Sequence, residues 1–339
     1  MKTKNSNWFS TITQCGLLLV VLILPQATQA KTWQATAGAQ SNDLGRQALA
    51  FLPDELWIHA GDEITWTFPT EEIHTVTFLK QDTSPQQVRP PRPGLPGGGC
   101  PGTTADDSNF DGSTCVTSIE LVSGQTYSVK FPTAGNFKVV CLVHANMTGA
   151  VHVLDPSVSL PNDQRSYDFL ANRQKNALLA DGAGLIGQAV ATAEQAGPNA
   201  ISAGIGEVTA TGGGSSTLSV LRFLRDSIVV HVGDTVEWTN LDPVTPHTIT
   251  FGTEPANPQT QVGLSSPDAD GARRATITSA QDSVSSGFIQ ASSQDRTGLP
   301  QLALATTRFR VTFNTPGTFN YICALHDEEG MVGKVIVRR

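Results

Sequence analysis

The chain has 339 residues, of which 39% are apolar and 6% aromatic, enough for two or three domains with hydrophobic cores. Its formal net charge is −8 at pH 7, and an acidic balance of this size argues against nucleic-acid binding. The one run that could enter a membrane, residues 16–24, is shorter than the roughly 20 apolar residues that a spanning helix needs.

The first 30 residues have the pattern of a secretory signal peptide. Lys2 and Lys4 precede the apolar run and ATQA follows it, so we expect cleavage after Ala30. The alternative is a retained membrane anchor, which the short apolar run disfavours. We therefore expect a secreted or periplasmic protein without a membrane span after cleavage.

Residues 31–155 are predicted to form a first β domain. Short alternating apolar runs at 49–68, 118–124, 126–131 and 137–141 are separated by turns, as in an antiparallel β-sandwich with Greek-key connections. A long insertion from Lys80 to about Thr117 interrupts them. It is rich in Pro and Gly, so we expect an exposed loop.

Cys100 and Cys115 lie in this insertion. In an exported protein, a disulfide is the default for such a pair, and a loop of this size would contribute roughly 3 kcal/mol. The alternative is an additional copper-storage site, although no His or Met lies between the two cysteines.

Residues 156–200 differ in composition, being rich in Ala, Leu, Gln and Glu. Several apolar residues recur there at helical spacing: Leu178, Leu185, Ala189 and Ala193. This pattern predicts one or two helices, broken near Asp181-Gly182. The alternative is a flexible linker, which three internal glycines favour.

Residues 201–339 repeat the first domain. FLRDSIVVHVGDTVEW aligns with FLPDELWIHAGDEITW, and the offset is 172 at Gly61/Gly233 and 182 at Cys141/Cys323. The difference of about ten residues falls in the second insertion, residues 253–302, where loop length is free to drift. The sequence thus predicts an all-β protein of two Greek-key β-sandwich domains joined by a short helical linker.

Each domain ends in the same arrangement of potential ligands. A strand is followed by Cys, by His three residues later and then by Met, and these residues are Cys141, His144 and Met147 in the first domain and Cys323, His326 and Met331 in the second. A thiolate, an imidazole and a thioether on one short turn suit copper better than calcium, magnesium or manganese. A further imidazole is available in each domain, where His74 or His247 opens a strand.

This pattern resembles the cupredoxin family of blue copper proteins. Cys-x2-His-x2-Met in the first domain is similar to amicyanin, and Cys-x2-His-x4-Met in the second to plastocyanin. The resemblance implies two type 1 copper ions per chain, one on each set of two His, one Cys and an axial Met. Apart from Met1, the chain has methionine only at the two axial positions. By the same resemblance, Thr75 and Thr248 stand where a hydrogen-bonding residue, commonly Asn, supports the site.

The function implied by the resemblance is single-electron transfer between redox proteins. A copper-binding or delivery protein would use the same ligands and is the main alternative. A copper oxidoreductase is a third, but the His next to Cys and the His-x-His pairs of such enzymes are absent, so we expect no enzymatic activity. An extra interface copper would need His59 or His231, which we otherwise expect, with His152, to face outward from strands.

The resemblance also indicates where partners dock. In cupredoxins the His that follows the Cys reaches the surface and is the usual electron exit, which implies contacts through His144 and His326. Asp327, Glu328 and Glu329 follow His326 and would steer a positively charged partner such as a basic cytochrome. The alternative is a solvated acidic turn.

Overall fold

The structure is a computed structural model that describes residue 1 and residues 29–83, 100, 108–291 and 307–339. The predicted signal peptide and most of the first insertion therefore lie outside the described residues. Within the described part of the chain, no helix has the length and hydropathy required to cross a membrane.

The first domain is a β-sandwich. Its strands are β1 (Thr32–Gln40), β2 (Arg46–Leu52), β3 (Glu55–His59), β4 (Glu63–Thr67), β5 (Thr77–Phe78), β6 (Val116–Thr117), β7 (Thr126–Lys130), β8 (Gly135–Val140) and β9 (Thr148–Leu154). Most pairs are antiparallel, but β1 runs parallel to β4 and β3 parallel to β9. The predicted β-sandwich is confirmed, and the two parallel pairs join strands that are not consecutive in the chain, which lets them run in the same direction.

The second domain repeats this plan. Its strands are β10 (Ala200–Ala210), β11 (Ser215–Leu224), β12 (Ser227–His231), β13 (Thr235–Leu241), β14 (Thr250–Phe251), β15 (Gln261–Val262), β16 (Leu264–Ser265), β17 (Arg273–Ile277), β18 (Val284–Ser286), β19 (Arg308–Phe313), β20 (Gly317–Ile322) and β21 (Val332–Arg338). The parallel pairs recur as β10 with β13 and β12 with β21. Four strands, β15 to β18, lie in the second insertion.

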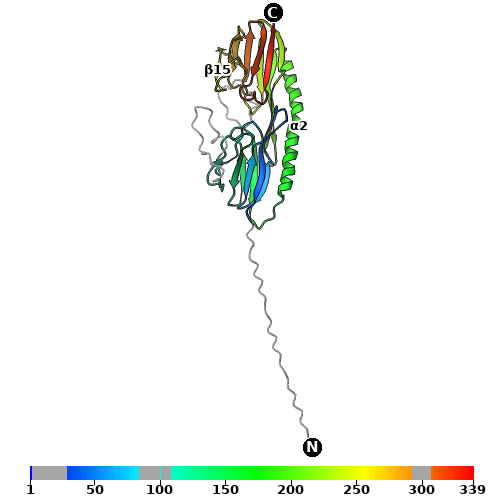
Figure 1. Ribbon diagram of the computed structural model, residues 1–339, viewed down its shortest axis with the longest axis vertical. Helices are drawn as coiled ribbons and strands as arrows, with labels where there is room; N and C mark the ends of the chain where they lie inside the picture. Colours follow the sequence, from blue (N-terminus) through cyan, green and yellow to red (C-terminus); the bar gives the residue numbers. More distant parts are fainter. Residues whose placement is uncertain (2–28, 84–99, 101–107, 292–306) are drawn as a thin grey trace.

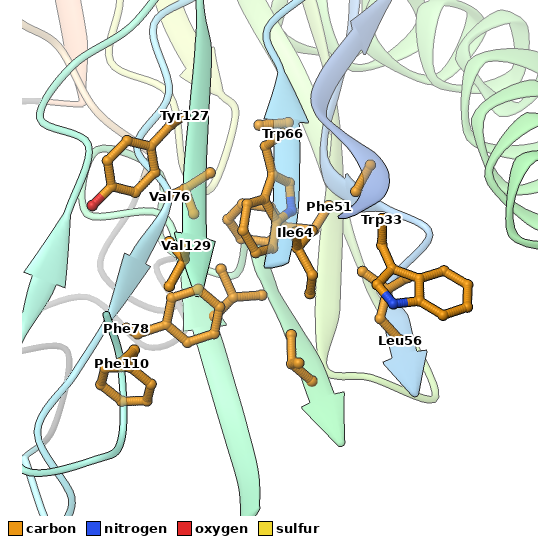
Figure 2. Packing of buried hydrophobic residues seen from close by; sticks show 14 of the residues in the cluster. Trp33, Phe51, Leu56, Ile64, Trp66, Val76, Phe78, Phe110, Tyr127 and Val129 are labelled. Atoms are coloured by element: carbon orange, nitrogen blue, oxygen red, sulfur yellow. The ribbon is translucent and has the colours of Figure 1, made fainter. Parts of the chain in front are cut away.

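Each domain has its own aromatic core. In the first, alternate residues of β4 point inward, so that Ile64 and Trp66 pack with Phe78 and Phe110 (Figure 2). In the second, Trp238 contacts Tyr321 edge to face. Cys141 and Met147 belong to the first core and Cys323 and Met331 to the second, so the potential metal ligands are set within rigid, well-packed layers.

The two domains join through equivalent strands. β2 pairs antiparallel with β11, and the register places Ala48 opposite Leu218 and Arg46 opposite Val220. By the repeat offset of 172, Leu218 is the equivalent of Arg46 and Val220 the equivalent of Ala48, so each pair is the other with the two domains exchanged. The domains therefore associate about a local pseudo-twofold axis, as identical subunits do in a symmetric dimer, and a continuous sheet crosses the boundary.

One helix, α2 (Gln164–Ala196), runs along both domains (Figure 1). It buries Leu185 and Ala189 against second-domain strands, while Leu178 packs on the first. The predicted break near Asp181-Gly182 was wrong. Gly182 allows close packing instead of ending the helix: a Cβ there would lie 2.4 Å from Arg46 Cδ, and Arg46 donates to the Leu179 carbonyl at 2.9 Å.

Candidate metal centres

The first centre brings His74 together with Cys141 and His144, which lie about 70 residues further along the chain. His74 is held by a backbone bridge to Leu121, Cys141 directly follows β8, and His144 lies in the β8–β9 loop. The two imidazoles face each other with their Nδ1 atoms 3.2 Å apart. The Cys141 sulfur lies 3.8 Å from Nδ1 of His144, and all three side chains are buried.

The second centre reproduces this geometry. His247 is held by a bridge to Ile289, and its Nδ1 lies 3.2 Å from Nδ1 of His326. The Cys323 sulfur is 3.8 Å from Nδ1 of His247 and 3.3 Å from Nδ1 of His326. Two copies with the same facing atoms show that the fold builds this arrangement from the repeated sequence pattern.

Both centres fit a soft metal ion. In each, the three donor atoms lie within 4.8 Å of one another. Burial opposes ionisation of the thiols, but hydrogen bonds and charge interactions with the paired imidazoles outweigh it and hold the pKa values of Cys141 and Cys323 well below the ordinary range. A thiolate and two imidazoles that converge through Nδ1 are the donor set expected for copper.

The predicted axial ligands, Met147 and Met331, are joined to the cysteines by backbone hydrogen bonds. The Cys141 amide donates to the Met147 carbonyl at 3.0 Å, and the Cys323 amide donates to the Met331 carbonyl at the same distance. Both methionine side chains are fully buried. Their role as axial ligands stays a prediction.

Thr75 and Thr248 connect the ligands within each centre. The Thr75 amide donates to the Cys141 sulfur at 3.4 Å, and the Thr248 amide donates to the Cys323 sulfur at 3.3 Å. Their hydroxyls accept the amides of Leu142 at 2.8 Å and of Ala324 at 2.7 Å. These bonds tie the strand that carries the first His to the loop that carries the Cys, and they place N–H dipoles on the sulfur.

Two glycines make room for the first His of each centre, and the sequence analysis missed them. Gly38 and Gly204 lie at register irregularities of β1 and β10, with φ of 82° and 76°. A Cβ at Gly38 would lie 2.4 Å from Nε2 of His74, and one at Gly204 2.2 Å from Nε2 of His247. The signal was available, because both glycines interrupt apolar strand patterns at similar points of the repeat.

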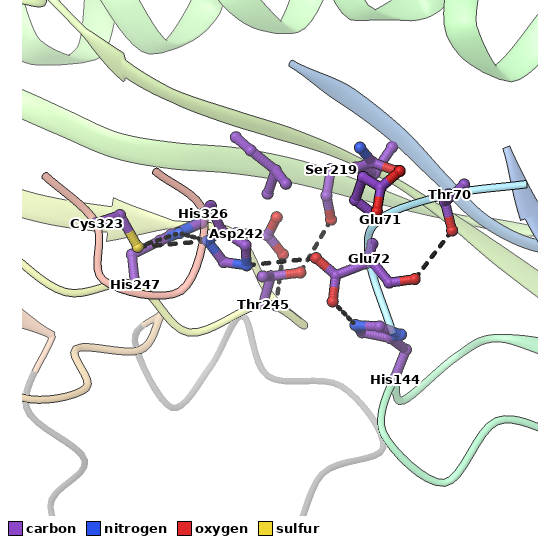
Figure 3. Close-up of polar contacts among 12 residues, drawn as sticks. Thr70, Glu71, Glu72, His144, Ser219, Asp242, Thr245, His247, Cys323 and His326 are labelled. Carbon is purple, nitrogen blue, oxygen red and sulfur yellow. Dashed lines mark hydrogen bonds and ion pairs between the residues drawn. The ribbon is translucent and has the colours of Figure 1, made fainter. Parts of the chain in front are cut away.

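His144 and His326 do not reach the surface, so the expectation that they are exposed electron exits was wrong. Each side chain is almost fully buried, with the residues 3% exposed. Nε2 of His144 lies 3.1 Å from Oε1 of Glu72, and Nε2 of His326 lies 3.4 Å from Oε2 of the same residue (Figure 3). The two imidazoles, one from each domain, thus contact the same carboxylate.

The carboxylate and the imidazoles shift one another's pKa. Burial alone would raise the pKa of Glu72, but hydrogen bonds from His144 and His326 hold it well below the usual range. Burial would lower the pKa of His144, yet Cys141 and Glu72 raise it to about 10. The pKa of His326 is raised in the same way, with the Cys323 charge as the largest favourable cause. Glu72 is therefore a buried anion held by imidazole partners on both sides.

The three acidic residues that follow His326 differ in their exposure to solvent. Glu328 is exposed and Asp327 half-buried, whereas Glu329 is buried and burial raises the pKa of its carboxyl. The Glu329 carbonyl accepts a hydrogen bond from Arg222 at 2.6 Å, close to the domain boundary. As part of a docking surface, Glu329 was therefore the wrong choice.

The remaining histidines lie outside the metal centres. His59 contacts the Val158 carbonyl at 2.7 Å, His152 lies between Asn136 and Glu55, and His231 is exposed. Among the described residues, none of them joins a cluster of potential metal ligands. Cys100 and Cys115 form a disulfide, which leaves Cys141 and Cys323 as the free thiols of the described chain.

Comparisons with known proteins agree with this description. The family of copper binding proteins of the plastocyanin/azurin type matches residues 39–154 and 209–338, most of the chain. A search of curated proteins found no match. The chain belongs to the plastocyanin/azurin copper-binding family, with one family unit in each domain and a candidate metal centre in each unit.

Solved structures of the same type are also similar to parts of the chain. A mutant plastocyanin of fern is 22% identical over 41% of this chain and 99% of its own, with a TM-score of 0.21. Amicyanin from Paracoccus versutus is 19% identical over 38% of this chain and 83% of its own, with a TM-score of 0.22.

Proposed function

We propose that this protein is an exported blue copper protein that binds one type 1 copper in each domain and carries single electrons between redox proteins. The observation that carries the proposal is the duplicated, buried set of one thiolate and two imidazoles that meet through Nδ1. Copper bound there would supply a one-electron couple.

The chain's own residues prepare the centre for such a couple. His74, Cys141 and His144 would hold the first ion and His247, Cys323 and His326 the second, with Met147 and Met331 as axial ligands. Backbone bridges at His74 and His247 and the buried cores fix the ligands, so little has to move when the charge changes. Burial of the ligands excludes water, and amide donors stabilise the thiolates.

Two alternatives are less well supported. A delivery protein has to release its metal to a partner, which burial of both ligand sets makes slow. In an oxidoreductase of the nitrite reductase or multicopper type, a His next to the Cys would connect the electron-transfer copper to a catalytic copper. Here Cys141 is flanked by Val140 and Leu142, and no His-x-His occurs anywhere in the sequence. We therefore propose a carrier and not an enzyme.

Export and a charged partner complete the proposal. The Cys100–Cys115 disulfide supports an oxidising compartment outside the cytosol, such as the periplasm. The exposed Glu328 and the half-buried Asp327 lie on the ligand loop of the second centre and support a positively charged redox partner, such as a basic cytochrome.

The function is tested by loading the mature chain with copper and measuring stoichiometry and visible absorption together. We expect two coppers per chain and an intense thiolate-to-copper band. Cys141→Ser should remove only the contribution of the first centre and Cys323→Ser only that of the second, because each domain has its own ligands. A colourless protein, one copper per chain, or loss of both bands in either variant would contradict the proposal.

A further inference from the structure

Glu72 lies between the two metal centres. It belongs to the loop that connects β4 to His74 and is 8% exposed. Its two carboxylate oxygens point to different domains: Oε1 is 3.1 Å from Nε2 of His144, and Oε2 is 3.4 Å from Nε2 of His326 (Figure 3). The Thr70 hydroxyl donates to the Glu72 carbonyl at 2.9 Å and fixes the loop.

The geometry of the imidazoles matches a shared acceptor. In both rings Nδ1 faces the sulfur and the other imidazole, so Nε2 is the nitrogen left to carry hydrogen. An ionised carboxylate only accepts and has lone pairs on both oxygens, so it can receive both Nε2–H groups at once. Such charge-assisted bonds set the tautomer and orientation of a metal-binding imidazole and raise its basicity.

The second repeat has no matching acid. Two residues before His247 the chain has Thr245, whose hydroxyl lies 3.2 Å from that of Ser219. The two domains are related by a pseudo-twofold axis, and among the described residues Glu72 is the carboxylate within ion-pair distance of both His144 and His326. A buried carboxylate is costly unless it is paired, and here both of its oxygens are paired with imidazoles.

We propose that Glu72 is a shared positioning residue that couples the two metal centres, by orienting His144 and His326 and by joining them through one carboxylate. The inference rests on the proposed copper binding. The connection runs from the His144 imidazole to the Glu72 carboxylate and on to the His326 imidazole, across Nε2–carboxylate contacts of 3.1 and 3.4 Å. With a one-electron metal bound at each centre, an electron lost by one centre would be gained by the other, and Glu72 would keep both Nε2 protons on the imidazoles.

The charge of Glu72 acts on both centres in the same direction. A buried anion stabilises the more positive state of each nearby site, because a low-dielectric surrounding screens it weakly. It therefore strengthens dication binding and lowers both reduction potentials. A residue with a purely local packing role would have neither effect.

The test compares Glu72→Gln with Glu71→Gln, an exposed neighbour that loses the same charge. Zn²⁺ affinity is measured by chelator competition in the Cys323→Ser background for the first centre and in the Cys141→Ser background for the second. We expect Glu72→Gln to weaken Zn²⁺ binding about 10- to 100-fold at both centres, the range for loss of such a partner. Glu71→Gln should change either affinity less than twofold. A change at one centre only, or at neither, would overturn the proposal.

Two further measurements separate coupling from misfolding. In the Zn²⁺-loaded protein, the Nε2–H signals of His144 and His326 should both be protected from exchange. Glu72→Gln should lose one of them, because an amide oxygen can accept from one imidazole while its NH2 group opposes the other. Glu72→Asp keeps the charge but shortens the side chain, so it should retain more of the affinity than Glu72→Gln and still lose protection. Unchanged protection in both variants would refute the bridge.

Zn²⁺ binding and imidazole protection do not depend on blue colour. If copper loading gives no thiolate band while Glu72→Gln still weakens Zn²⁺ binding at both centres, the proposed function fails and the shared role of Glu72 stands. With copper bound, both reduction potentials should rise in Glu72→Gln. A tenfold loss of Cu²⁺ over Cu⁺ affinity corresponds to about 59 mV for one electron, and unmoved potentials would contradict the coupling.

Discussion

At the scale of single residues, the two centres depend on glycines that leave space for imidazole rings. Gly38 and Gly204 combine a left-handed backbone with a close approach to His74 and His247. Any side chain there meets two separate penalties, backbone strain and overlap with a ligand. Because the rings of His74 and His247 are buried in close-packed surroundings, they cannot move aside for an added side chain.

We expect Gly38→Ala to destabilise the protein by more than about 1 kcal/mol and to alter the absorption of the first centre only. Gly204→Ala should do the same to the second centre. Gly124→Ala is the matched control, since Gly124 has the same φ of 82° but open space around its Cα. Thermal unfolding and visible spectra of the three variants check this. If Gly124→Ala also disturbed a centre, strain and not contact with the ligand would be the cause.

At the scale of elements, α2 acts as a common support for both domains. Its apolar face packs on β2 of the first domain and on β10 and β11 of the second. A helix of this length gains most of its stability from such tertiary contacts. Its three glycines, which suggested a flexible linker, differ in their surroundings: Gly182 packs on Arg46, whereas a Cβ added at Gly184 or Gly187 would meet nothing within 4 Å.

This difference predicts that substitution by alanine changes the free energy of unfolding differently at Gly184 and at Gly182. Gly184→Ala should raise the free energy of unfolding by about 0.5–1 kcal/mol, because alanine restricts the unfolded chain and meets no neighbour. Gly182→Ala should give no gain or a loss, because its methyl group would displace Arg46 from the Leu179 carbonyl. Urea unfolding of both variants measures the difference. Equal stabilisation by both would mean that Arg46 moves aside without cost.

For the molecule as a whole, the domain arrangement decides how the proposed redox partner could reach the candidate metal centres. His144 and His326 face the domain boundary, so an encounter surface has to involve other residues of the ligand loops. Asp327 and Glu328 lie on the second ligand loop between His326 and Met331, and their charge is partly or fully exposed. Charges there would steer a basic partner without direct contact to the imidazole.

We expect reduction by a basic cytochrome to slow as ionic strength rises, since salt screens charge over about 10 Å at 0.1 M. The double variant Asp327→Asn/Glu328→Gln should flatten this dependence. The control is Asp181→Asn/Glu194→Gln, which removes two exposed acids from α2. Stopped-flow rates at several salt concentrations compare them. An equal salt slope in the wild type and the Asp327/Glu328 variant would exclude this docking surface.

The class of fold and the Cys and His residues of each candidate centre could be predicted from the sequence alone. Cys141, His144 and Met147 share one short loop, as do Cys323, His326 and Met331, and spacing along a loop is a local property that survives folding. The alternating strands and the repeat predicted two β-sandwich domains for a similar reason, since period-two burial is set by the backbone.

The surroundings of the two centres depend on contacts between residues that are far apart in the chain. The pairing of β2 with β11 depends on which edges remain free after each domain folds, and no local pattern reports it. That pairing buries His144 and His326, places Glu72 between them and makes Glu329 part of the interior. Likewise, the low helix propensity of glycine predicts a break at Gly182, whereas its close approach to Arg46 exists only in the packed protein. Burial and shared contacts arise from residues far apart in the chain, which is why spacing predicts candidate ligands but not their neighbours.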